Sequence, residues 1–143
     1  MRRFFFLCPY DNNPYGGIKI IYRHVEVLND LGFKAFVYHE KSGFKINWFK
    51  TSAPIAYPES GWFKTAPPFQ KEDIVVLPEY NLLKTYPVFK RYPYLVFNQN
   101  AYLTFNHAAL PSKSFNKLPP LKEYLDSQGI ITVSEDNLAI LKA

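Results

Sequence analysis

The clearest helical signal of the sequence lies in GGIKIIYRHVEVLNDLGF, at residues 16–33. Apolar residues recur in it at steps of three and four, which is the spacing of one face of an α-helix: Ile18, Ile21, Val25, Leu28 and Leu31. Charged residues fall on the opposite face: Lys19, Arg23, Glu26 and Asp30. Gly32 follows directly, where a residue with positive φ ends a helix at little cost. The pattern predicts an amphipathic helix over residues 18–31, opened by Gly16 and Gly17.

Short apolar segments flank this helix and recur along the chain. Residues 3–8 and 33–39 read as strands, so the order is strand, glycine loop, helix, glycine and strand, a βαβ unit. Further strands are expected at 73–77, 94–97 and 130–133, and further helices within 79–91, at 120–127 and after Ser134. The prediction is an α/β fold: one Rossmann-like domain over residues 1–143, with an open, mostly parallel sheet and helices on both faces. Residues 40–72 are irregular and aromatic, typical of a two-stranded excursion or a packed surface loop.

Composition limits the kinds of partner. The 143 residues, enough for one domain, carry 17 basic and 12 acidic side chains, a net charge of +5. That balance favours an anionic ligand or an anionic membrane surface, but the charges are scattered and we expect no nucleic-acid partner. With Cys8 as its single cysteine, the chain can form no internal disulfide, which favours a reducing, cytoplasmic compartment. The apolar run that precedes Pro9 is too short for a signal peptide or a membrane span, and a buried strand explains it better.

Polar or glycine residues follow four of the five predicted core strands. Ligands of open α/β sheets bind beyond the carboxyl ends of the strands, so these residues are the candidate ligand-binding set. They are Gly16, Gly17 and Lys19 after the first strand, Glu79 after the third, Asn98, Gln99 and Asn100 after the fourth, and Ser134 and Glu135 after the fifth.

Each candidate also has a purely structural interpretation. The glycine pair either lets a phosphate approach the helix N-terminus, with Lys19 beside it, or supplies a turn that needs positive φ. Glu79 either binds sugar hydroxyls or caps the next helix. Ser134 and Glu135 are sufficiently explained as a helix cap and first turn.

The remaining titratable residues give no catalytic group. His24 is expected to be a packed, hydrogen-bonded residue and Cys8 a core residue, while the roles of His39 and His107 stay open. The three histidines lack the spacing of metal ligands, so we expect no metal and no cofactor, and no catalytic residue is identified.

Several of these strings together resemble the GT-B glycosyltransferases of the family 1 and family 4 group. The string at residues 16–24 resembles their first βαβ unit, the pattern L-x-x-x-G-[HF]-x-[AV]-x-V is matched at residues 28–37, and residues 74–79 and 133–135 resemble later strand ends. The resemblance implies an N-terminal domain that binds the sugar acceptor, with a glycine loop that closes over the phosphates of a nucleotide-sugar donor. It also implies a C-terminal donor-binding domain with paired glutamates, which we expect to be absent here.

One position departs from the family pattern. Many relatives have His or His-Asp after the fourth strand, where this chain has Asn98-Gln99-Asn100. Amides hydrogen-bond sugar hydroxyls but are poor general bases, so no catalytic residue is carried over.

Three functional hypotheses follow. The first is the acceptor-binding half of a glycosyltransferase, inactive as an isolated chain. The second is a stand-alone Rossmann-like binding or regulatory module that associates with a partner protein or with its own copies. The third is peripheral attachment to the anionic inner face of a membrane through exposed rings of Trp48, Trp62 and Phe63.

Overall fold

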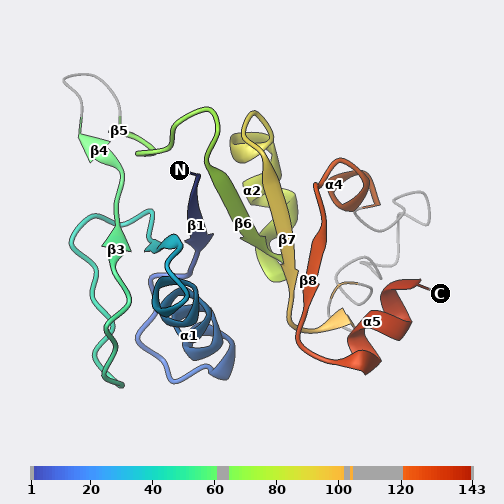
Figure 1. Cartoon of the computed structure of the whole chain (residues 1–143), viewed down its shortest axis with the longest axis horizontal. Helices are drawn as coiled ribbons and strands as arrows, with labels where there is room; N and C mark the ends of the chain where they lie inside the picture. Colours follow the sequence, from blue (N-terminus) through green and yellow to red (C-terminus); the bar gives the residue numbers. More distant parts are fainter. Residues whose placement is uncertain (1, 61–64, 102–103, 105–120, 143) are drawn as a thin grey trace, which may run out of the picture. The chain divides into compact units, whose positions relative to one another are not determined.

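The computed structural model describes residues 2–60, 65–101, 104 and 121–142 and shows an α/β fold (Figure 1). Its six-stranded parallel sheet has the strand order β3-β2-β1-β6-β7-β8, which confirms the predicted Rossmann-like open sheet. Its strands are β1 Arg3–Leu7, β2 Lys34–Tyr38, β3 Ile55–Ala56, β6 Ile74–Pro78, β7 Tyr94–Asn98 and β8 Ile130–Thr132. Its helices are α1 Gly16–Asp30, the 3-10 turn η1 Glu79–Asn81, α2 Leu82–Phe89, α4 Leu121–Leu125 and α5 Glu135–Lys142. The chain divides into two compact units, Met1–Val75 and Val76–Ala143.

In the first unit, α1 ends as the sequence predicts. Gly32 has φ +86°, its N–H donates to the carbonyl of Asn29, and the N–H of Phe33 donates to the carbonyl of Leu28. These two bonds form a Schellman motif, which satisfies carbonyls that the helix leaves unpaired. The buried face differs from the prediction at two apolar positions, because Leu28 is half-buried and Leu31 is 68% exposed. Leu31 is the C-cap of the helix, and Tyr22, at 1% exposure, fills the core instead.

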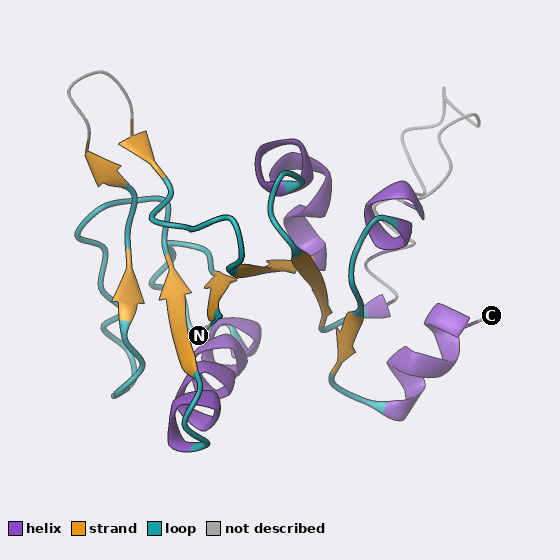
Figure 2. Cartoon of the chain, turned by 45° about the horizontal axis from the view of Figure 1, so that its top comes forward, coloured by secondary structure: helices purple, strands orange, loops and turns teal. Residues whose placement is uncertain are grey.

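The aromatic N-terminal segment forms the strand β1, and the last three residues of this strand are buried. β1 pairs in parallel with β2 from Arg3 opposite Lys34 to Leu7 opposite Tyr38, and α1 packs beside them (Figure 2). Phe5 is 1% exposed and its ring lies 4.5 Å from that of Phe69. The prediction of a buried strand at the N-terminus is therefore confirmed.

The irregular segment contributes two small strand pairings. The two-residue strand β3 pairs in parallel with β2, which the sequence did not predict. β4 Glu59–Ser60 and β5 Thr65–Ala66 form an antiparallel pair, so the predicted two-stranded excursion is present.

All five residues of β6 are buried. In the second unit, β7 pairs in parallel with β8. Two tyrosine hydroxyls join its helices and strands. The hydroxyl of Tyr86 on α2 donates to the Asp126 carboxylate at 2.5 Å, and that of Tyr94 on β7 donates to the Glu123 carbonyl at 2.6 Å.

Asp73 is a buried carboxylate that ties together distant parts of the first unit. It is 1% exposed and accepts hydrogen bonds from the Arg3 side chain, with Nη2 at 2.5 Å, and from the N–H of Gln70 at 2.7 Å. Arg3 also donates to the carbonyl of Pro68 at 3.1 Å. Burial raises the pKa of Asp73, but the hydrogen bonds from Arg3 and Gln70 outweigh it, so the pKa lies below its ordinary value. The carboxylate fixes the start of β1 beside the turn that leads into β6.

We predict that Asp73→Ala lowers the free energy of unfolding by about 3 kcal/mol, because it leaves the Arg3 guanidinium without its charge partner. Urea titration at pH 7 measures the change. The matched control is Glu72→Ala, an exposed neighbour, which should stay within about 0.5 kcal/mol of the unsubstituted protein. Equal stability of the two variants would contradict this role of Asp73.

Candidate functional site

The carboxyl ends of β6 and β7 in the second unit bring three of the predicted site residues together. The N–H of Asn100, just after β7, donates to Glu79 Oε1, just after β6, at 3.0 Å. Glu79 also accepts backbone hydrogen bonds from Gln99 and Tyr80. The carboxylate therefore bridges the two strand ends and also caps the first turn after β6, which combines a tertiary contact with the helix-cap role considered from the sequence.

Asn98, at the last position of β7, lies inside a polar network. Its side chain is fully buried, and Nδ2 donates to Thr104 Oγ1 and to the Tyr124 hydroxyl, each at 2.7 Å. Its Oδ1 has no hydrogen-bond partner among the described residues. The Asn137 amide, 5% exposed, donates to the Asn98 carbonyl and accepts from the N–H of Ala101. The first amide of the predicted Asn-Gln-Asn string is thus part of the interior, while Gln99 and Asn100 are half-buried.

A cavity of about 540 Å³ opens beside Glu79. Its polar lining comes from Glu79, Asn81, Lys84 and Thr104, and its apolar lining from Tyr80, Leu82 and Leu83. Tyr80 is 45% exposed, so part of its ring is available to a ligand. Burial raises the pKa of Glu79, and the backbone N–H groups that bind the carboxylate offset only part of that effect. The cavity combines a carboxyl group, an amide, an amine, a hydroxyl and an aromatic ring.

Ser134 and Glu135 begin the last helix, as predicted. Ser134 Oγ accepts a hydrogen bond from the N–H of Asn137 at 3.2 Å, which is the bond of a helix N-cap. Glu135 lies exposed in the first turn of α5. The cap positions Asn137 against Asn98, and this supports the structural interpretation of Ser134.

Gly16 and Gly17 form the first turn of α1 in the first unit. The glycines with positive φ in the described part of the chain are Gly32 and Gly43, so the interpretation of the pair as a positive-φ turn is wrong. A Cβ added to Gly16 would meet no atom within 4 Å, so packing does not demand glycine there. The N-cap residue Tyr15 makes no side-chain capping bond. The exposed Lys19 lines a second cavity, of about 330 Å³, together with Gly16, Arg23 and Lys50.

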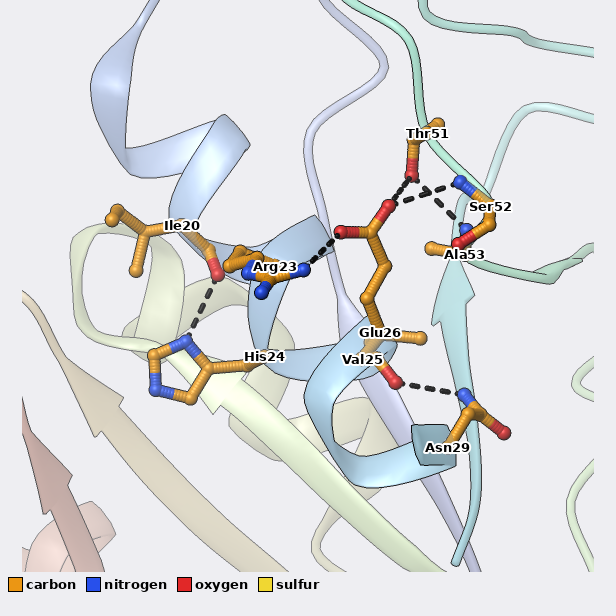
Figure 3. Close-up of polar contacts among 9 residues, drawn as sticks. All are labelled: Ile20, Arg23, His24, Val25, Glu26, Asn29, Thr51, Ser52 and Ala53. Carbon is orange, nitrogen blue, oxygen red and sulfur yellow. Dashed lines mark hydrogen bonds and ion pairs between the residues drawn. The ribbon is translucent and has the colours of Figure 1, made fainter. Parts of the chain in front are cut away.

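Glu26 holds the wall of this second cavity in place (Figure 3). The sequence placed it on a solvated face, but it is half-buried. Its Oε1 accepts from Thr51 Oγ1 at 2.7 Å and from the N–H of Ser52 at 2.9 Å, and its Oε2 accepts from Arg23. The hydrogen bonds from Thr51 and Ser52 lower the pKa of Glu26. These contacts bind the segment before β3 to the helix.

His39, whose role the sequence left open, is fully buried in the first unit. Its Nδ1 lies 3.0 Å from the carbonyl of Cys8 and its Nε2 lies 2.7 Å from the Tyr22 hydroxyl. A carbonyl only accepts, so Nδ1 carries the proton and the tyrosine hydroxyl donates to Nε2. Burial lowers the pKa of His39 to about 4, although the Cys8 carbonyl favours the charged form. The histidine is a neutral core residue, and Cys8 is buried as predicted.

The remaining predictions concern His24, the aromatic residues proposed to contact a membrane, and metal binding. His24 is half-buried, and its Nδ1 donates to the carbonyl of Ile20 within the same helix, as expected for a packed residue. Trp48 is half-buried, whereas His107, Trp62 and Phe63 lie outside the described residues. Within the described ranges, no group of three or more His, Cys, Asp or Glu side chains is placed to hold a metal ion. No helix in that part of the chain has the length and apolar character to cross a membrane.

Comparison of the chain with protein-family models, with curated proteins and with solved structures finds no match.

Stability should fall in mild acid because of His39. The folded ring stays neutral down to about pH 4, whereas the unfolded ring takes up a proton near pH 6.5, so its contribution is complete above that pH and is lost below it. We expect a loss of about 2 kcal/mol between pH 7 and pH 5. Urea titrations at the two pH values measure it, with His24→Gln as the control that keeps this loss. A His39 ring resonance that titrates near pH 6.5 in the folded protein would contradict the prediction.

Two substitutions of Glu79 distinguish how much its charge and its hydrogen bonds each contribute to the free energy of unfolding. Since the raised pKa shows that the fold favours the uncharged carboxyl group, Glu79→Gln should match or exceed the parent in free energy of unfolding at pH 7. Glu79→Ala leaves the N–H of Asn100 without its acceptor and should cost about 1–3 kcal/mol. Denaturant titration compares the pair, and a Gln variant as unstable as the Ala variant would show that the charge itself is required.

Proposed function

We propose that this chain binds a sugar acceptor in the Glu79 cavity and acts as the acceptor-side domain of a glycosyltransferase. Such an enzyme transfers a sugar from a nucleotide-sugar donor to a hydroxyl group of the acceptor. The observation that carries the proposal is the position of the cavity, which lies at the carboxyl end of β6 and is lined by Glu79, Tyr80 and Asn81. Ligands of open α/β sheets bind beyond strand ends of this kind.

The lining of the cavity suits a carbohydrate. Sugar hydroxyls both donate and accept hydrogen bonds, and the carboxyl of Glu79, the amide of Asn81 and the hydroxyl of Thr104 supply both kinds of partner. The exposed part of the Tyr80 ring offers a flat apolar surface against the C–H face of a sugar ring. A few polar groups among apolar walls are the usual composition of a small-molecule site.

The sequence resemblance supplies the reaction class. In the resembled group, the loop after the first strand closes over the donor phosphates, and Gly16 is free of any packing demand for glycine in this chain. The buried amide of Asn98 stands where many relatives have a histidine, so proton transfer from the acceptor is not assigned to this residue. We expect the 143-residue chain by itself to bind acceptor without turnover.

The test is titration of the ¹⁵N-labelled chain with a panel of methyl glycosides, followed by amide chemical shifts. We expect saturable shifts at residues 79–84 with a dissociation constant on the order of 1 mM. Tyr80→Ala should abolish these shifts while leaving the fold intact. The matched control is Tyr92→Ala, which lies outside the lining residues of the cavity and should bind as the parent does.

Two results would count against the proposal. The first is the absence of glycoside-dependent shifts at residues 79–84 across the panel. The second is sugar transfer from a nucleotide sugar by the purified chain, measured by release of the nucleotide, which would contradict the expected lack of turnover.

A further inference from the structure

The second cavity lies wholly within the first unit, between α1 and residues 49–50. Its volume is about 330 Å³. It is lined by Gly16, Lys19, Ile20, Tyr22, Arg23, Glu26, Phe49 and Lys50. It shares no lining residue with the Glu79 cavity, so a ligand here does not rest on the proposed function.

The inner part of this cavity is apolar. Tyr22 is buried at 1% exposure, and the half-buried ring of Phe49 packs edge-on against it with the centroids 5.2 Å apart. Ile20 contributes an aliphatic side chain that is 41% exposed on the helix surface. An apolar group placed between Ile20 and Phe49 would remove hydrophobic surface from water, which is favourable.

The outer part of this cavity is cationic. Lys19, Arg23 and Lys50 are all exposed, and they face a single carboxylate, that of Glu26. That carboxylate is already occupied, because it accepts from Thr51, Ser52 and Arg23. Lys19 and Lys50 form no ion pair with the described residues, so their charges remain available to a ligand.

We propose that this cavity binds an amphiphilic anion, the phosphate monoester of an apolar alcohol. The phosphate lies between Lys19 and Lys50, and the first carbons of the alcohol contact Ile20 and Phe49. A phosphate monoester carries up to two negative charges and three acceptor oxygens, so two or three cations can bind it at once. Inorganic phosphate would contact only the cations of the cavity, whereas the phosphate monoester would also contact its apolar side chains.

Decyl phosphate below its micellar concentration is the direct probe. The chain has two tryptophans, and Trp62→Phe leaves Trp48, whose ring lies 4.6 Å from that of Phe49, as the single fluorescent reporter. We expect a saturable change in its emission with decyl phosphate. Inorganic phosphate should bind at least about tenfold more weakly, because it lacks the apolar part. Decyltrimethylammonium should not bind, because its charge is repelled.

Substitutions distinguish specific binding in this cavity from nonspecific binding of the amphiphile. The double variant Lys19→Gln with Lys50→Gln should weaken decyl phosphate binding by about tenfold or more. The matched control, Lys34→Gln with Lys71→Gln, removes two exposed lysines that line neither this cavity nor the Glu79 cavity and should bind as the parent does. Since all four side chains are exposed, the variants should keep the thermal midpoint of the parent. Equal binding by both double variants, or binding of decyltrimethylammonium as tight as that of decyl phosphate, would overturn the proposal.

Vesicles distinguish the two sources of such a ligand. Co-sedimentation with phosphatidylcholine vesicles containing phosphatidic acid, lost in the Lys19 and Lys50 double variant, supports a lipid headgroup as the ligand. Binding of free decyl phosphate without co-sedimentation supports a soluble alkyl phosphate. Failure of both decyl phosphate and these vesicles to bind overturns the inference.

Discussion

Burial of polar groups at the carboxyl ends of β6 and β7 is the constraint on which the Glu79 cavity depends. Glu79 receives the N–H of Asn100, Asn98 donates to Thr104 and Tyr124, and Asn137 bonds the backbone on both sides of this turn. Each of these hydrogen-bonding groups would cost free energy if buried without a partner, so the bonds among them hold the strand ends in shape. The same bonds hold Glu79 at the wall of the cavity.

The two cavities call for different chemistry, although helix starts contribute to both. The Glu79 cavity offers a carboxyl group, an amide, an amine and a hydroxyl beside an aromatic ring, which suits a polyhydroxyl compound. The Lys19 cavity offers cations around apolar side chains, which suits an anion that carries an apolar part. In the second case Glu26 is the organising residue, because it accepts hydrogen bonds from Arg23, from the Thr51 hydroxyl and from the N–H of Ser52 and so sets the cavity wall.

Local signals in the sequence predicted most helices and strands, whereas the long-range polar contacts could not be predicted from it. The Schellman motif at Gly32 and the N-cap at Ser134 were predictable because each depends on a few neighbouring residues. The pairings of Arg3 with Asp73, of Glu26 with Thr51 and of His39 with Tyr22 join residues far apart in sequence, and no periodicity reports them. The strand β3 is only two residues long, too short to show an alternating pattern. For the site, strand-end position correctly placed Glu79 beside a cavity. It gave no sign that Asn98 is buried, since its partners come from Thr104 and Tyr124.

Intermolecular nuclear Overhauser effects test most directly whether the Glu79 cavity receives a sugar. The measurement uses the intact chain with the methyl glycoside that gives the largest amide shifts. Sugar binding in this cavity predicts Overhauser effects between the ring protons of Tyr80 and the C–H protons of the sugar, because the exposed part of this ring lines the cavity. Overhauser effects confined to side chains outside the cavity, with none to Tyr80, would contradict it.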